Sequence, residues 1–298
     1  MKKVLLCFVS DDTKFLETAL ETLDRQQNGI ELVDSVAISD IPKVDVEACD
    51  IILAVGAKEV GMSEVTEAFQ QMNLPAEKLL GDWIVCIPGF TLEKYRKLQR
   101  SRLSIFSRNC FAGVISNALG LPFRSPTVNL TISDEDFIRF MRAPRVYMEE
   151  ELIFSSKKFN AYDGHDIATF ICGNIPVVMN HYPNFDLAKQ AWERRKTRIN
   201  WYNLFVTMTT NNPDVLQKFD ELPFGKKICF VPFKSDLDSA YYVNTEKGFQ
   251  SNPNIKRETV DPEYFTWEIV NRSALDLKFF YDPFDMLIYG KKTPVIEM

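Results

Sequence analysis

The feature that most constrains this chain is an alternation, over its first hundred residues, of strand-length apolar runs with helical stripes. The apolar runs lie at residues 3–9, 30–38, 51–55 and 83–87. Apolar residues at helical spacing lie in segments 13–25, 62–72 and 92–100. Strands that alternate with helices form a parallel sheet covered on both faces. Residues 1–98 are therefore predicted to form a small Rossmann-like domain.

This first domain lacks the signals of a phosphate-binding loop. The first strand-to-helix turn, Ser10–Thr13, contains no glycine and carries two aspartates, which repel a pyrophosphate. The segment Gly56–Gly61 lacks the Gly-Lys-Ser/Thr ending of a P-loop. A structural role is favoured for this domain, and nucleotide binding by it stays open.

Aromatic residues are distributed unevenly along the chain. Of the 23 Phe, 10 Tyr and 4 Trp, only 6 fall in residues 1–98 and 31 follow. This asymmetry predicts two domains, 1–98 and 99–298, the second a larger, aromatic-rich α/β domain with a mixed sheet. Its hairpin signal is Gly173-Asn174 between two apolar runs. From Ser239 onward, aromatic strands and turns are expected that pack as a core, with a sugar-stacking surface as the alternative.

Composition excludes several classes of function. The net charge of −6 gives no electrostatic footprint for nucleic-acid binding, and no apolar stretch reaches the length of a membrane span. Two histidines exclude a His-rich metal site. The six cysteines are at least 24 residues apart, which excludes Cys-x-x-Cys zinc or redox sites and is typical of buried thiols in a reducing cytoplasm.

Cys110 is a candidate nucleophile. The segment Arg108-Asn109-Cys110 lies between a strand at 103–107 and a helix at 111–119, and Asn109 suits the helix N-cap. A thiol at a helix N-terminus beside an arginine has a lowered pKa. The alternative is that Cys110 only packs in the first helical turn. His181, at a strand end, is a candidate general base, with capping or packing as the alternative.

Arg195 is expected on the apolar face of a helix that begins near Asn184. Arg198 lies about 60° from Arg195 on the helical wheel. A buried guanidinium needs a partner, here either a protein carboxylate or a bound anion. The helix leads into a strand at 201–208, which places Arg195, Arg198 and Asn200 near a sheet edge, where ligands of α/β proteins gather.

Two Asp-x-Asp spacings raise the question of a metal site. Asp134 and Asp136 follow Ser133 in capping-box spacing, which suffices to explain them. Asp236 and Asp238 follow another strand, and metal binding by this pair stays open. No metal ligand is assigned.

The second domain resembles an uncharacterised family, the domain of unknown function of proteins labelled exopolysaccharide or capsule biosynthesis. The resemblance covers roughly residues 103–235. Its motifs are Ser107-Arg108-Asn109-Cys110-x-x-Gly113, Leu119-Gly120-Leu121-Pro122-x-x-Ser125-Pro126, His181-Tyr182, Trp192-x-Arg194-Arg195-x-x-Arg198-Ile199-Asn200 and Asn203-Leu204-Phe205-Val206. The resemblance implies a role near bacterial surface polysaccharide, on a cytosolic glycosyl or acyl transfer step.

Two hypotheses follow for the function. The first is a transferase that uses an anionic sugar-nucleotide or acyl donor, with Cys110 and His181 as catalytic candidates. Its candidate substrate- or anion-binding residues are Arg108, Asn109, Ser125, Arg195, Arg198 and Asn200. The second is a non-catalytic module that binds a saccharide intermediate or a partner enzyme. The transferase hypothesis requires Cys110, His181 and Arg195 to converge. The sequence identifies no cofactor and no oligomeric state.

Overall fold

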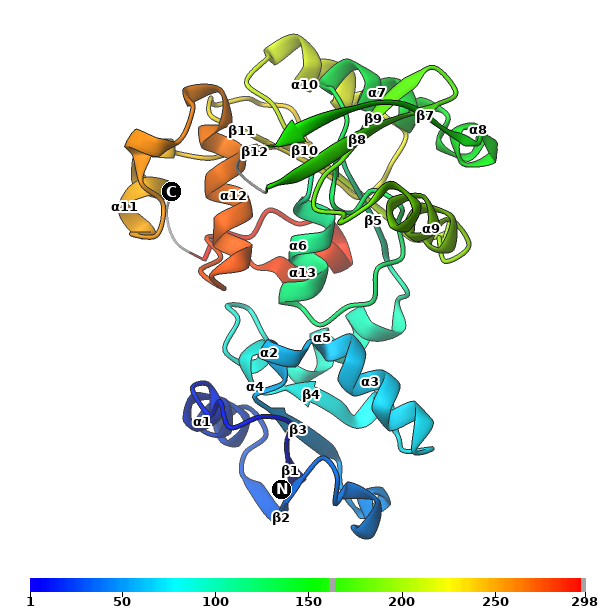
Figure 1. Cartoon of the computed structure of the whole chain (residues 1–298). Coiled ribbons are helices and arrows are strands. Elements are labelled where there is room, and N and C mark those ends of the chain that lie inside the picture. The colour runs from blue at the N-terminus through cyan, green and yellow to red at the C-terminus, as the bar shows by residue number, and fades with distance from the viewer. Residues whose placement is uncertain (161–163, 296–298) are drawn as a thin grey trace. The chain divides into compact units, whose positions relative to one another are not determined.

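The computed structural model describes residues 1–160 and 164–295, which fall into two compact units (Figure 1). The first unit comprises residues 1–95 together with 116–122, and the second comprises 96–115 and the chain from residue 123 onward. The division after residue 95 lies close to the predicted boundary at 98. The uneven distribution of aromatic residues did not predict that segment 116–122 belongs to the first unit.

The first unit contains a four-stranded parallel sheet of order β2-β1-β3-β4. Its strands are β1 (Lys2–Phe8), β2 (Ile30–Ala37), β3 (Ile51–Val55) and β4 (Leu79–Gly81). Its helices are α1 (Leu16–Gln26), α2 (Ala57–Val60), α3 (Met62–Gln71) and α4 (Asp82–Val85), and α5 (Leu92–Arg100) leads into the second unit. All five residues of the central strand β3 are buried, which explains why its sequence is apolar throughout. The predicted parallel α/β organisation is confirmed.

The strand predicted at residues 83–87 is wrong. The strand is β4, four residues earlier, and residues 82–85 form the short helix α4. Asp82 explains the change because its buried carboxylate accepts hydrogen bonds from the backbone N–H groups of Trp83 (2.9 Å) and Gly56 (3.3 Å). These bonds turn the chain into a helix at the end of β4. The apolar run at 83–87 had instead predicted a strand there.

The second unit contains two sheets. A parallel sheet has the order β12-β11-β10-β5, and an antiparallel sheet has the order β6-β9-β8-β7. The parallel strands are β5 (Ser104–Ser107), β10 (Leu204–Thr209), β11 (Lys227–Val231) and β12 (Ala240–Tyr242). The antiparallel strands are β6 (Leu130–Thr131), β7 (Leu152–Asn160), β8 (His165–Cys172) and β9 (Ile175–Met179). The hairpin at Gly173-Asn174 is confirmed, but parallel and antiparallel pairs occupy separate sheets rather than the single mixed sheet predicted.

The described part of the second unit contains several helices. They are α6 (Phe111–Ala118, whose last residues belong to the first unit), α7 (Asp134–Arg142), α8 (Pro144–Glu149), α9 (Phe185–Lys196), α10 (Pro213–Asp220), α11 (Thr245–Ser251), α12 (Phe265–Leu275) and α13 (Pro283–Tyr289). The side chains of Ser133, Asn184 and Asn212 each accept a backbone N–H of the following helix. Among the described residues, no helix is long and apolar enough to cross a membrane.

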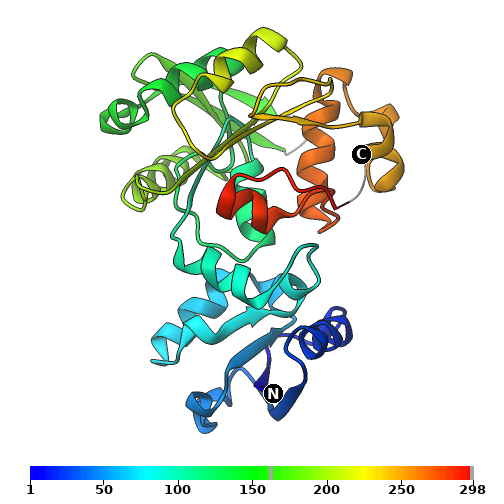
Figure 2. The same ribbon diagram turned by 180° about the vertical axis from the view of Figure 1, so that it is seen from behind.

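The chain after Ser239 is mainly helical, which corrects the predicted strands and turns. It forms α11, α12 and α13 and the short strand β12, and α12 packs beside β11 (Figure 2). The aromatic side chains of this part pack as a core, as predicted. Phe230 lies 5.4 Å from Tyr241 and 5.5 Å from Tyr281 between ring centroids, and Tyr281 is fully buried. The aromatic pairs therefore reflect packing between helices and the sheet.

Candidate functional site

A cavity of about 410 Å³ lies where strands β5 and β10 end. The two strands are parallel neighbours, with Phe106 opposite Val206 and Ser107 opposite Thr207, so that their carboxyl ends share one sheet edge. Arg108 directly follows β5 and Thr210 directly follows β10, and both residues line the cavity. The lining is completed by Ser133, Asp134, Thr209, Asn211, Asn212, Glu263, Tyr264, Thr266 and Trp267. This edge is where α/β proteins bind ligands.

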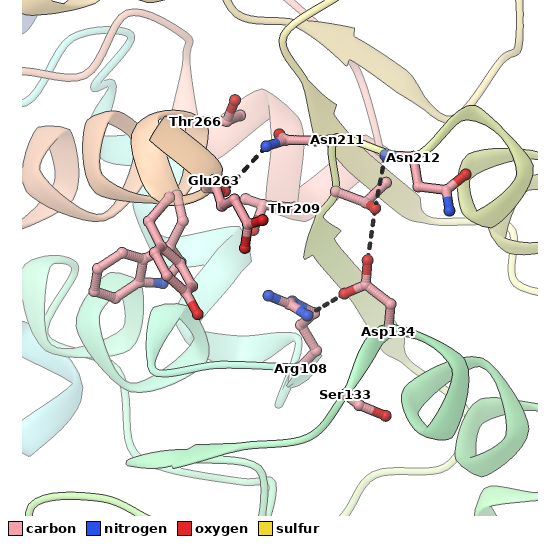
Figure 3. Close-up of a pocket in the computed structure, with 11 residues that line it drawn as sticks. Arg108, Ser133, Asp134, Thr209, Asn211, Asn212, Glu263 and Thr266 are labelled. Carbon is pink, nitrogen blue, oxygen red and sulfur yellow. Dashed lines mark hydrogen bonds and ion pairs between the residues drawn. The ribbon is translucent and has the colours of Figure 1, made fainter. Parts of the chain in front are cut away.

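A hydrogen-bonded chain fixes one wall of the cavity. The Arg108 guanidinium forms an ion pair with Asp134, the first residue of α7. The Thr210 hydroxyl donates to the other oxygen of Asp134 (2.6 Å) and accepts from the Asn212 backbone N–H (3.2 Å; Figure 3). Both carboxylate oxygens of Asp134 are therefore held by protein donors.

The cavity walls contain buried polar atoms without a hydrogen-bond partner anywhere in the described chain. They are Arg108 Nε, Thr266 Oγ1 and Trp267 Nε1. An unpaired buried donor costs about 1–3 kcal/mol, and native proteins keep few of them. These atoms have almost no accessible surface, so a ligand in the cavity does not reach them in this conformation, and the case for a ligand rests on the other groups of the lining.

The charges of the cavity do not favour an anion. Arg108 contributes one positive charge, whereas Asp134 and Glu263 contribute two negative charges. Within the described residues, the Glu263 carboxylate forms no ion pair, although its backbone carbonyl accepts from Asn211 Nδ2 (3.0 Å). The aromatic side chains of Tyr264 and Trp267 form part of the lining. This lining suits a neutral, hydroxyl-rich ligand better than a phosphate.

Of the predicted site residues, Arg108 lies in the cavity, and Cys110 lies in a different group of contacts. Asn180 Nδ2 donates to Thr131 Oγ1 (2.7 Å) and lies 3.8 Å from the buried Cys110 Sγ. Two residues after Asn180, the hydroxyl of Tyr182 donates to the carbonyl of Val128 (3.0 Å). Burial raises the pKa of the Tyr182 hydroxyl, against the opposing influence of Arg195.

Arg195 is buried, 7% exposed, as the helical wheel predicts. Its partners are neutral: Nη1 donates to the hydroxyl of Tyr182 (2.5 Å) and to the carbonyl of Val128 (3.5 Å), and its guanidinium lies 5.0 Å from the ring centre of Phe123. Neither a carboxylate nor an ion pair is among its contacts in the described chain. The structure thus brings Cys110, Tyr182 and Arg195 together, whereas His181 between Asn180 and Tyr182 is exposed, with φ +57°.

Three other predicted residues hold the backbone. Asn109 Oδ1 caps α6 by accepting from the Phe111 N–H (3.1 Å), and its buried Nδ2 has no partner in the described chain. Ser125 Oγ bonds to Thr127 Oγ1 (2.8 Å). The backbone N–H of Asn200 donates to Ser104 Oγ (2.9 Å) at the start of β5. Asn200 therefore lies at the amino edge of the sheet, opposite to the edge with the cavity.

Arg198, Asp236 and Asp238 are exposed. The two aspartates lie in the loop after β11 and do not line the cavity. Across residues 1–160 and 164–295, no group of three or more His, Cys, Asp or Glu side chains is placed to hold a metal ion.

The sequence interpretation did not identify the side of the cavity formed by Glu263, Thr266 and Trp267. These residues come from the end of the chain that was expected to form strands. The cavity itself could have been found from the polar segments that follow two strands, at Arg108 and at Thr210–Asn212. Neighbouring parallel strands such as β5 and β10 end at the same edge of a sheet, so these segments lie together.

Comparison with known proteins gives a family without a known activity. Residues 85–271 match the family described as "Domain of unknown function (DUF1919)". An uncharacterised protein of Haemophilus influenzae is 30% identical over 195 residues, which cover 64% of this chain and 84% of that protein. The matched range includes every residue that lines the cavity, as well as Cys110, Tyr182 and Arg195. Because the match covers more than half of the chain, the protein belongs to the DUF1919 family.

Proposed function

We propose that the second unit binds a saccharide, or the sugar part of a larger metabolite, in the cavity at the carboxyl edge of β5 and β10. The observation that carries the proposal is the composition of the lining, in which the Glu263 carboxylate, without an ion pair in the described chain, lies in one cavity with the aromatic residues Tyr264 and Trp267. A carboxylate accepts hydrogen bonds from sugar hydroxyls.

The charge and the aromatic lining support the same class of ligand. Asp134 and Glu263 can accept hydrogen bonds from sugar hydroxyls, and the excess of one negative charge opposes a phosphate. Trp267 and Tyr264 offer apolar ring faces for the C–H face of a pyranose. With the motif resemblance, these features favour a role in the cytoplasmic part of exopolysaccharide or capsule biosynthesis.

The test compares two tyrosine-to-leucine variants. Tyr264→Leu removes an aromatic ring that lines the cavity, and Tyr202→Leu removes an exposed ring that does not line it. Calorimetric titration is made with a panel of neutral hexoses, N-acetylhexosamines and their disaccharides. We expect Y264L to weaken binding about 2- to 10-fold, the value of one aromatic contact, and Y202L to bind like the wild type. No binding by any sugar, or equal binding by both variants, would exclude this site.

Glycosyl transfer is the second candidate function. It is favoured by Glu263, whose carboxylate lines the cavity without an ion pair in the described chain and could accept a proton from an attacking hydroxyl. Glu263→Gln is expected to keep saccharide binding and to abolish turnover of a nucleotide-sugar donor. Turnover that survives E263Q but is lost in Cys110→Ser would instead support the predicted nucleophile Cys110, with His181→Gln as the test of the predicted base.

A further inference from the structure

Several arginines of the second unit form no ion pair with a described residue. Five of them are Arg102, Arg124, Arg194, Arg195 and Arg198. Other arginines of this unit do pair: Arg108 with Asp134, Arg139 with Asp136 and Arg257 with Glu246.

The five residues are linked by shared neighbours and by mutual repulsion. Burial lowers the pKa of the Arg124 guanidinium, and repulsion from Arg102 and Arg198 lowers it further, which requires all three to lie near one another. Phe123, the neighbour of Arg124, lies against the Arg195 guanidinium. Arg194 acts together with Arg195 on the Tyr182 hydroxyl. The cluster so defined will be called the arginine cluster.

Arg195 is the member whose surroundings argue for a ligand. Its Nη1 is used on the oxygens of Tyr182 and Val128, whereas no described residue accepts from its Nε or Nη2. These two nitrogens are not among the fully buried unpaired atoms, so some of their surface is open to solvent. A guanidinium that is 7% exposed and has no counter-charge is costly unless an anion reaches it.

We propose that the arginine cluster binds the phosphate or diphosphate group of a small molecule. Guanidinium groups bind phosphate through paired N–H···O bonds, and several of them match the two or three charges of a diphosphate. The small exposed surface of Arg195 and the net charge of −6 favour a compact anion over a nucleic acid or a membrane surface. This site is separate from the proposed saccharide cavity, because none of the five arginines lines that cavity.

The test is titration of the whole protein with inorganic pyrophosphate, at constant ionic strength, against inorganic phosphate and sulfate. Arg198→Gln removes an exposed cluster member, and Arg142→Gln removes an exposed arginine at the end of α7 as a matched control of charge. We expect R198Q to weaken pyrophosphate binding about 10-fold, as for one charge-assisted hydrogen bond, and R142Q to change it less than 2-fold. Saccharide binding by R198Q should equal that of the wild type, because Arg198 does not line the saccharide cavity.

Three outcomes would overturn the proposal. They are no pyrophosphate binding at millimolar concentration, equal weakening in R198Q and R142Q, and tighter binding of a single-stranded oligonucleotide or an anionic phosphatidylglycerol vesicle than of pyrophosphate. A nucleoside diphosphate that binds more tightly than pyrophosphate, with the same loss in R198Q, would support the proposal and identify the phosphate as part of a nucleotide.

Discussion

Trp83 offers a quantitative test of how segment 116–122 is held in the first unit. Its side chain is 1% exposed, and its Nε1–H donates to the backbone carbonyl of Ala118 (2.9 Å), 35 residues later in the chain. Trp83→Phe leaves this buried carbonyl unpaired, which costs about 1–3 kcal/mol, and leaves a void in a fully packed site. We expect the free energy of unfolding to fall by about 2–4 kcal/mol in total.

The control is Trp192→Phe, the same loss of volume without a lost hydrogen bond. Trp192 is also 1% exposed, but its Nε1 has no partner in the described chain, so that phenylalanine removes an unpaired donor. Urea unfolding is followed by far-ultraviolet circular dichroism, and each transition is fitted separately because the two tryptophans belong to different units. A loss in W83F no greater than in W192F would refute the hydrogen-bond argument.

Three further predictions concern single residues. Burial lowers the pKa of Lys226 to about 8, so the folded state binds fewer protons than the unfolded state between pH 8 and 10.5. Over this range the stability of the wild type, measured by urea unfolding, should rise with pH relative to Lys226→Met by up to about 3 kcal/mol. Parallel pH curves for the two proteins would contradict this. Gly120→Ala should lower the free energy of unfolding by about 2–4 kcal/mol, because φ is +60° and a Cβ would lie 2.9 Å from Ile84. Gly173→Ala should cost only about 1 kcal/mol, because φ is +59° but a Cβ would make no contact under 3.3 Å. Equal losses of stability in thermal unfolding would refute the contribution assigned to the clash with Ile84. Burial raises the pKa of Asp82, so the folded state keeps its proton to higher pH, and wild-type stability should fall relative to Asp82→Asn as pH rises from 3.8; a gap that widens in favour of the wild type would contradict this.

Local patterns predicted most of the elements. The cap at Ser133, the helix start near Asn184 and the strand at 51–55 were recognised because each depends on residues that are neighbours in the sequence. The strand expected at 83–87 failed for the opposite reason. The partner of Asp82 is Gly56, 26 residues earlier, and no local pattern reports that contact.

The site was predictable only in part for the same reason. Helical periodicity predicted that Arg195 is buried, but its partners Tyr182, Val128 and Phe123 come from three other segments. The sequence suggested either a protein carboxylate or a bound anion as the partner of Arg195. The fold instead supplies neutral oxygens, those of Tyr182 and Val128. Asn200 was expected near a ligand-binding sheet edge, yet the direction of the strand places it at the amino edge.

Strand direction also separates the two proposed binding sites. Arg102 precedes β5 and Arg198 precedes β10, whereas Arg108 and Thr210 follow these strands. The four residues of β5 span about 13 Å at 3.3 Å per residue. A compact donor whose phosphate is held by Arg102 and Arg198 cannot also place its sugar against Trp267 at the carboxyl edge without spanning the length of β5. Pyrophosphate held by these two residues and a saccharide in the cavity are therefore expected to bind without competing, and a transferase mechanism would require the anionic group of its donor to be held by residues other than Arg102 and Arg198.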